Sequence, residues 1–260
     1  MINVRHLHKV YHTDSGSTEA IRDVSFSIGR GDFVSVVGPS GAGKSTLIKA
    51  LAGLQPGTSG AVLYEGRQID RPQTDFALVF QDYARSLYPW FSLERNITLP
   101  LDNRIGSAAE RKRIARNMLE RVGLAGMADK RPTQLSGGQQ QRVAIARALA
   151  YAPKVLIMDE PFASVDAQTR FDLEDLVLKL RRESDCTVVL VTHDIDEAAY
   201  MSDRIIVLNR APSTVIKEID VDLPAPRDQI ATKSLPQFAA VRAEVLRAIR
   251  GQADESRLAA

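Results

Sequence analysis

The chain has 260 residues, of which 44% are hydrophobic and 25% charged, and its formal net charge is only +2. Such a composition is typical of a globular protein with one sizeable core, and it excludes a disordered chain. The single cysteine, Cys186, excludes an internal disulfide framework. The weak charge imbalance does not indicate nucleic-acid binding. We expect neither a membrane span nor a secretory leader, because no long apolar run is present.

The first part of the chain predicts strands that lead into a glycine-rich loop. Residues 2–11 alternate between apolar and polar side chains and predict a strand, and residues 24–28 and 33–37 predict two more. The third strand enters GPSGAGKST, residues 38–46, which fits the phosphate-loop pattern G-x-x-x-x-G-K-[ST]. A helix should follow over residues 44–52 and end at glycine. A phosphate loop requires this order of strand, loop and helix.

The residue types of this loop suit a polyphosphate. Glycines allow successive backbone N–H groups to turn toward one phosphate, and the following helix adds its positive end. Lys44 supplies charge to the outer phosphates, and the Ser45 hydroxyl suits Mg²⁺. Thr46 is placed to hold an inner phosphate. The predicted nucleotide-binding loop therefore consists of Gly38, Pro39, Ser40, Gly41, Ala42, Gly43, Lys44, Ser45 and Thr46.

The middle of the chain predicts helices. Residues 77–80 predict a short strand that ends before Gln81. Capping boxes then open two predicted helices, over residues 107–122 and 136–150. Because no strand is evident between about 85 and 150, we interpret this stretch as a helical lobe inserted into an α/β core.

The core resumes with two compact apolar runs, residues 155–158 and 187–191, which are typical of buried parallel strands. The helix predicted between them indicates a parallel sheet with helices on both sides. Asp159 follows the first run, where a carboxylate can hold Mg²⁺ through its water shell. Glu160 comes next and is the natural general base, or polarising group, for an attacking water.

The last fifty residues predict a tail. Residues 215–221 alternate loosely, and two prolines interrupt the chain after them. Ser234 and Gln237 predict a capping box and a helix that begins at Ser234. We expect its apolar stripe to pack on the body of the protein rather than on a membrane.

The second glycine motif is LSGGQ, residues 135–139. Ser136 and Gln139 form a capping box, so one interpretation is a well-capped helix. This interpretation does not account for Gly137 and Gly138, because glycine is unfavourable in a first helical turn. The other interpretation is that a γ-phosphate approaches the backbone at this helix start.

In this order, the motifs resemble those of the ATP-binding subunit of ABC transporters over roughly residues 1–210. The resemblance implies an α/β fold of the P-loop NTPase (ABC ATPase) type, with a parallel-sheet core, an N-terminal antiparallel β lobe and the helical lobe at about 85–150. It implies one nucleotide-binding domain over 1–210 and an extension over 211–260 packed on it. It further implies a head-to-tail homodimer, in which Ser136, Gly137, Gly138 and Gln139 close on ATP held by the other subunit.

The resemblance also implies roles for single residues. Tyr11 matches the aromatic that stacks on adenine, and Asp166 matches the aspartate that crosses the dimer interface. Gln81 matches the glutamine that senses the metal and the attacking water, and His193 matches the histidine that contacts the γ-phosphate. ATP and Mg²⁺ are the implied cofactors. The implied catalytic residues are Glu160, His193 and Gln81, and the implied magnesium-binding residues are Ser45, Gln81 and Asp159.

The segment SLYPWF, residues 86–91, lies in the region that docks a permease helix in this family. The alternative is that Trp90 and Phe91 belong to the core of the helical lobe. The family implies two integral-membrane permease subunits, an indirect partnership with a periplasmic or lipid-anchored solute-binding protein, and no nucleic-acid partner. It places the chain peripherally on the cytoplasmic face of the cell membrane.

The segments FQDY, residues 80–83, and IDVDLP, residues 219–224, resemble importers of the nitrate, sulfonate and taurine group. The predicted function is therefore ATP hydrolysis that powers uptake of a small anion such as nitrate, an aliphatic sulfonate or taurine. An alternative is a soluble non-transport ABC ATPase of the DNA repair or translation type. Such proteins usually carry coiled-coil or zinc-bearing insertions, or two cassettes, which this sequence lacks. A kinase would share the phosphate loop but not residues 135–139.

Overall fold

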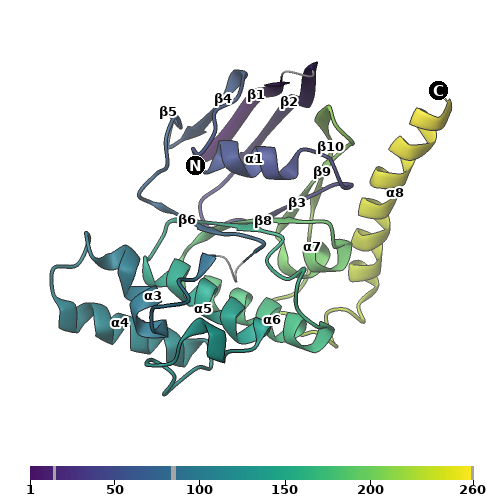
Figure 1. Ribbon diagram of the computed structural model, residues 1–260. Helices are drawn as coiled ribbons and strands as arrows, with labels where there is room; N and C mark the ends of the chain where they lie inside the picture. Colours follow the sequence, from purple (N-terminus) through teal and green to yellow (C-terminus); the bar gives the residue numbers. More distant parts are fainter. Residues whose placement is uncertain (14–15, 83–85, 259–260) are drawn as a thin grey trace. The chain divides into compact units, whose positions relative to one another are not determined.

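The computed structural model describes residues 1–13, 16–82 and 86–258, with side chains as far as residue 251 (Figure 1). Tyr83, the last residue of the FQDY segment, lies outside the described residues. The chain divides into two compact units, one formed by residues 1–73 with 186–260 and the other by residues 74–185. The division into a domain over 1–210 and an extension over 211–260 stays a prediction.

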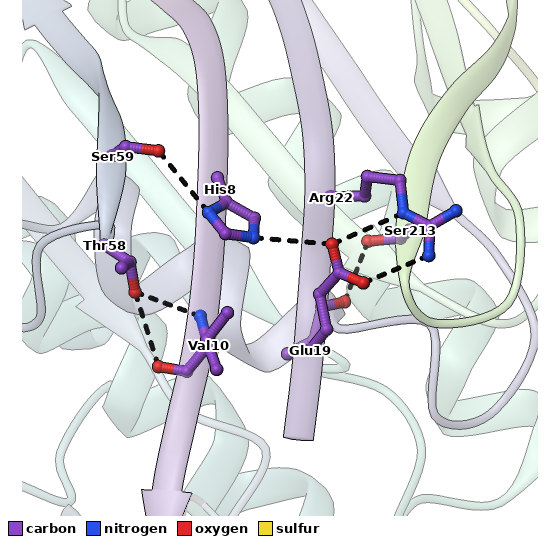
Figure 2. Close-up of polar contacts among 8 residues, drawn as sticks. His8, Val10, Glu19, Arg22, Thr58, Ser59 and Ser213 are labelled. Carbon is purple, nitrogen blue, oxygen red and sulfur yellow. Dashed lines mark hydrogen bonds and ion pairs between the residues drawn. The ribbon is translucent and has the colours of Figure 1, made fainter. Parts of the chain in front are cut away.

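An antiparallel β lobe begins the first unit. The strand β1 (Ile2–Thr13) pairs with β2 (Gly16–Ile28) and with β4 (Ser59–Tyr64), which pairs in turn with the short β5 (Arg67–Gln68). Figure 2 shows His8 between the two neighbours of its strand, with Nδ1 3.4 Å from Ser59 Oγ and Nε2 3.4 Å from Glu19 Oε1. The lobe is therefore joined by side chains as well as by its backbone ladders.

The parallel part of the first unit centres on β3 (Phe33–Val37), which lies between β8 (Thr187–Thr192) and β9 (Arg204–Leu208). Every residue of β3 and β8 is buried, as expected for strands covered on both faces. The strand β10 (Ser213–Asp220) runs antiparallel to β9 and parallel to β2. After β3 comes α1 (Lys44–Leu51), followed by a glycine with φ of 69°. The predicted helix and its glycine stop are confirmed.

Two helices complete this unit, α7 (Ile195–Met201) and the C-terminal α8 (Pro236–Leu258), and the first part of α8 contacts α7 (Figure 1). The predicted capping box at Ser234 is wrong. Helix α8 begins two residues later at a proline, whose missing N–H is no loss at that position. The Ser234 hydroxyl instead donates to the Ile230 carbonyl at 2.7 Å.

The second unit contains the parallel pair β6 (Phe76–Val79) and β7 (Val155–Asp159) together with helices. Helices α3 (Leu93–Thr98), α4 (Ala108–Arg121) and α5 (Gly137–Ala150) contact one another, and α6 (Ala167–Ser184) follows β7. Short 3-10 turns cover residues 99–101 and 132–134. Over 86–150, within the described residues, the structure contains helices and no strand, which confirms the predicted helical lobe.

Among the described residues, no helix has the length and apolar character needed to cross a membrane.

Candidate functional site

The phosphate loop has the backbone shape that its glycines predict. Gly41 and Gly43 have φ of 79° and 71°, in the left-handed region that glycine adopts without strain. A Cβ built on Gly43 would lie 2.8 Å from the Ala20 carbonyl oxygen, so a side chain is excluded by space as well. No described side chain caps the first turn of α1 at Gly43. This helix start therefore has the form of an anion cradle.

Lys44 lies inside this loop. Its side chain is 7% exposed, and its ammonium donates to the Gly38 carbonyl at 2.8 Å and to the Pro39 carbonyl at 3.2 Å. The Ser45 side chain is exposed and that of Thr46 is half-buried. The loop thus presents a held positive charge, a hydroxyl and backbone N–H groups, which together fit a polyphosphate with Mg²⁺.

Gly38 and His193 directly follow the carboxyl ends of two neighbouring parallel strands, and these two strand ends lie side by side in the sheet. Val37, the last residue of β3, pairs with Thr192, the last residue of β8. The phosphate loop and His193 follow these two residues directly, at the carboxyl ends where ligands bind in parallel sheets. The His193 side chain is exposed. The structure therefore brings the predicted histidine to the strand next to the one that leads into the loop.

Tyr11 reaches the same helix from the antiparallel lobe. Its hydroxyl lies 3.2 Å from Thr46 Oγ1 and donates to Gln55 Oε1 at 3.1 Å. The Lys9 ammonium lies 5.3 Å from the centroid of the tyrosine ring. The predicted adenine-stacking residue is thus fixed beside the phosphate-loop helix. Sequence reasoning missed Gln55, which carries no motif of its own.

In the second unit, β6 and β7 place the other predicted catalytic groups together. Val79 pairs with Met158, and two residues beyond this pair the amide of Gln81 donates to the Glu160 carboxylate, with Nε2 3.4 Å from Oε2. Asp159 ends β7 and is partly exposed. The predicted general base and the glutamine predicted to sense water are therefore neighbours.

Glu160 has φ of 43°, which is uncommon for a residue with a side chain. Such a conformation costs about 1–3 kcal/mol and persists only where the surroundings impose it. A tight turn follows, in which the Ala163 N–H donates to the Glu160 carbonyl at 3.2 Å, and the Phe162 side chain is fully buried. This turn places Glu160, whose carboxylate contacts Gln81, directly after the end of β7. No sequence pattern predicted this backbone conformation.

The start of α5 is capped by its own side chains. The Ser136 hydroxyl accepts from the Gln139 N–H at 3.4 Å, and Gln139 Oε1 accepts from the Ser136 N–H at 3.1 Å. The predicted capping box is confirmed. A Cβ built on Gly138 would lie 2.3 Å from Thr169 Cγ2 on α6, so close packing by itself accounts for this glycine. Ser136 and Gly137 are exposed.

Asp166 is linked to this glycine through the same threonine. As the cap of α6, the Asp166 carboxylate accepts from the Thr169 N–H at 3.0 Å and from its hydroxyl at 2.7 Å. These two bonds stabilise the ionised form and hold the pKa of Asp166 below its ordinary value. Thr169 therefore contacts both a predicted interface aspartate and the LSGGQ motif. Sequence analysis did not single it out.

A cavity of about 710 Å³ opens next to Gln81 and Asp159. Arg147 lies in its wall, where its guanidinium donates to the Ser86 carbonyl at 2.6 Å and to the Ser86 hydroxyl at 3.0 Å. Burial lowers the pKa of Arg147 below its ordinary value. The lining residues are Phe80, Gln81, Asp82, Ser86, Tyr88, Leu99, Pro100, Arg147 and Asp159.

The aromatic segment, residues 86–91, lies beside this cavity and is held in place by Asn96. This buried amide accepts from the Tyr88 N–H at 2.8 Å and donates to the Tyr88 and Ser92 carbonyls, both at 3.1 Å. Trp90 is 63% exposed. The interpretation of Trp90 as lobe core is therefore wrong. Large exposed aromatics on a rigid support are typical of protein interfaces.

A family model described as ABC transporter matches residues 21–163, more than half of the chain. The chain belongs to the ABC transporter family. The match spans the phosphate loop, the LSGGQ motif and the strand that ends at Asp159. The resemblance inferred from the motifs is thereby confirmed.

Three curated relatives carry transport names. The nitrate import ATP-binding protein NrtC of Synechococcus elongatus is 41% identical over 96% of this chain and 38% of its own length. The bicarbonate transport ATP-binding protein CmpC of Synechocystis is 43% identical over 94% of this chain and 37% of its own length. The chain thus spans less than two fifths of the length of these two relatives. The nitrate transport protein NasD of Klebsiella oxytoca is 40% identical over 95% of both chains.

Solved structures agree with the fold. A dimeric bacterial ABC transporter cassette is 35% identical and matches 85% of this chain and 99% of its own, with a TM-score of 0.76. A dimeric ATP-binding cassette in a post-hydrolysis state, bound to ADP and Pi, matches with 35% identity and a TM-score of 0.75, over the same shares. The predicted α/β fold of the ABC ATPase type is confirmed.

Proposed function

We propose that this chain is the ATP-hydrolysing subunit of an ABC importer, which powers uptake of a small anion through separate permease subunits. The observation that carries the proposal is the phosphate loop that encloses Lys44, on a chain that also holds Gln81 against Glu160. Charge, backbone donors and a general base are the groups that phosphoryl transfer to water requires. The alternative of a soluble non-transport ABC ATPase is not favoured, because the relatives carry transport names.

Within the proposed reaction, different groups of the chain have different roles. Lys44 and the backbone N–H groups of residues 38–46 bind the phosphates, and Tyr11 stacks on the adenine. Glu160 takes the proton of the attacking water, while Gln81 orients that water and His193 contacts the γ-phosphate. Ser45, Gln81 and Asp159 would hold Mg²⁺, whose oxygen ligands they match. The ion supplies charge neutralisation at the phosphates.

We propose further that two copies form a head-to-tail homodimer that encloses ATP. Ser136, Gly137, Gly138 and Gln139 of one copy would face the γ-phosphate held by the other, and Asp166 would cross the interface. The exposure of Ser136 and Gly137 at the start of α5 supports this arrangement. So do the two similar solved cassettes, both of which are described as dimeric.

The hydrolysis step is tested by Glu160→Gln in the full chain. We expect turnover of MgATP to fall by about 10²–10⁴-fold, the range that a general base contributes. Glu120→Gln is the matched control, since Glu120 is exposed on the surface and has no proposed role. Turnover that persisted in Glu160→Gln would refute the assigned mechanism.

The permease partner is proposed to dock at the aromatic segment beside the 710 Å³ cavity. The complex would contain two integral-membrane permease subunits, with a periplasmic or lipid-anchored solute-binding protein as indirect partner. The chain would lie on the cytoplasmic face of the membrane. Trp90→Ala should abolish recovery of the permease from solubilised membranes, whereas Leu54→Ala, which removes another exposed side chain, should not. Equal recovery with both variants would exclude this docking site.

The cargo is proposed to be a small anion of the nitrate, sulfonate or taurine type. The names of NrtC and NasD specify nitrate, and that of CmpC adds bicarbonate. A strain lacking this chain should lose uptake of one labelled anion among nitrate, bicarbonate, taurine and aliphatic sulfonates, and should regain it with the wild-type chain. Undiminished uptake of all four would refute the cargo class.

A further inference from the structure

His193 stands between two residues that are hydrogen-bonded to the first turn of α7. The Thr192 hydroxyl donates to the Glu197 carboxylate at 2.6 Å and accepts from the Asp194 N–H at 3.0 Å. The Asp194 carboxylate in turn accepts from the N–H groups of Asp196 and Glu197, at 2.8 and 3.2 Å. Thr192 and Glu197 are buried. The backbone of His193 therefore follows the position of α7.

Helix α7 has only 7 residues, too few for a helix to be stable or to hold its orientation by itself. Its far end is held by Arg227, from the chain that follows β10. The guanidinium donates to the carbonyls of Ala199 and Tyr200, in the last turn, and to that of Ser202 at 2.6 Å. Carbonyls at a helix end lack partners within the helix, so a cation fork there satisfies and orients them.

The first turn of α7 is held by the C-terminal helix. Arg242 on α8 forms an ion pair with Asp196. A third cation, Lys233, lies 4.7 Å from the centroid of the buried Tyr200 ring. Cationic groups of the tail thus contact α7 at both ends.

The tail itself is anchored, so it can act as a rigid support. The Asp228 carboxylate accepts from the N–H groups of Ile230 and Ala231, at 2.9 and 2.7 Å, directly after Arg227. Helix α8 buries Phe238 and Val245. The turn next to Arg227 and the helix that carries Arg242 are thus both held by contacts of their own.

We infer that Arg227 and Arg242 are positioning residues for ATP hydrolysis, which act through α7 on His193. The inference rests on the proposed function. Without the arginines, both ends of α7 lose polar contacts that orient the helix and the histidine beside it, while the phosphate loop keeps its own contacts. A misplacement of about 1 Å far from the chemistry can lower turnover by up to about 10²-fold. The segment after residue 220 therefore has a part in the catalytic step.

The test measures kcat and KM for MgATP in the full chain. Arg227→Gln and Arg242→Gln should each lower kcat by about tenfold and change KM by less than about twofold, because the phosphate loop that binds the nucleotide is unchanged. Arg242→Lys should restore kcat, since a lysine keeps the ion pair with Asp196. Arg247→Gln is the matched control, because Arg247 is exposed on the same helix and forms no ion pair with any residue that the structure describes.

A double-mutant cycle separates positioning from general destabilisation. Once His193→Ala has removed the group that is positioned, adding Arg242→Gln should lower the residual turnover by less than about twofold. An exposed ion pair contributes little to stability, so Arg242→Gln should fold even if Arg227→Gln does not. An unchanged kcat in Arg242→Gln, or an equal loss with and without His193, would overturn the inference. Absence of turnover in the wild-type chain would instead refute the proposed function.

Discussion

The two glycine-bearing helix starts, those of α1 and α5, differ in whether side chains satisfy their backbone N–H donors. At α1 no described side chain caps the first turn, two glycines have positive φ, and a lysine ammonium lies inside the loop. At α5 a serine and a glutamine cap the turn reciprocally. A Cβ on its glycine Gly138 would collide with a threonine methyl. The first start is shaped for an anion, whereas the second is complete without one.

This difference indicates what each start can do alone. The α1 start should bind nucleotide within one subunit, because its donors and its charge come from one continuous segment. The α5 start offers a hydroxyl and the N–H groups of an already capped turn, so its affinity for phosphate should be weak by itself. It should act only where the other subunit already holds the phosphate, which is the arrangement proposed for the dimer.

Among the tests of this comparison, the largest expected effect comes from Ser136→Asp. Aspartate caps a helix about as well as serine, so stability should stay within a few tenths of a kcal/mol. Its negative charge would repel the γ-phosphate of the partner, and turnover should fall by about 10²-fold, as on loss of a transition-state donor. Thermal unfolding and ATPase assays measure the two effects.

Ser107→Asp, the same change at the cap of α4, is the control and should leave turnover intact. If Ser136→Asp also kept full turnover, the start of α5 would be a structural cap and nothing more.

Lys44→Ala should show that α1 binds nucleotide in a single subunit. Losing a charged hydrogen-bond donor costs about 1.5–3 kcal/mol, so affinity for ATP should fall by about 10- to 100-fold. Calorimetry at a concentration where the chain is monomeric measures it. Lys49→Ala, an exposed lysine on the same helix, should bind as the wild type does. Equal affinity in both variants would remove the distinction between the two starts.

Gly138→Ala with and without Thr169→Ser decides why α5 carries a glycine. The added methyl should overpack against Thr169 and destabilise the fold by about 1–3 kcal/mol. Thr169→Ser removes the opposing methyl but keeps the hydroxyl that donates to Asp166, so the double variant should recover most of the stability.

Chemical unfolding measures the stability, and the ATPase rate of the double variant distinguishes the two roles of the glycine. A stable and active double variant would mean that Gly138 serves packing. A stable but inactive one would mean that the glycine admits a phosphate.

The smallest effect concerns the helices packed against α5. Asp102 accepts two hydrogen bonds from Arg95, at 3.0 and 2.8 Å, and lies 3.2 Å from Arg111 Nε. Arg95 in the first place, with Arg111 adding to it, holds the pKa of Asp102 below its ordinary value. The ionised form therefore stabilises the fold above the ordinary pKa, and this contribution is lost as the pH falls through the lowered value.

Asp102→Asn should consequently show a shallower loss of stability in acid than the wild type, measured by urea unfolding between about pH 5 and pH 2. Asp129 is exposed and forms no ion pair with any residue that the structure describes, so Asp129→Asn should follow the wild-type curve. Parallel curves for all three proteins would contradict the assigned link.

Much of the fold could be predicted from the sequence, because the periodicity, turn and capping signals of these elements come from residues close together in the chain. The strand, loop and helix around residues 33–51, and the helix that begins after Ser136, depend on residues within a few positions of each other. The error at Ser234 arose because a capping box and a turn share the same residues, and a proline two positions on decided the start. The exposure of Trp90 could not be predicted, since it depends on which tertiary neighbours cover the side chain.

The sequence by itself determined the chemistry of the site: a loop whose glycines and lysine suit a polyphosphate, a carboxylate pair after a buried strand, and a capped second helix start. Only the tertiary structure decided which residues support that chemistry. Thr169 packs against Gly138, Arg227 contacts the end of α7 and the residue after it, and Arg242 contacts the first turn of α7. Each of these contacts joins positions that lie 25 or more residues apart in the chain. Such contacts leave no periodic pattern in a sequence, because they arise from the packing of whole elements rather than from neighbouring residues.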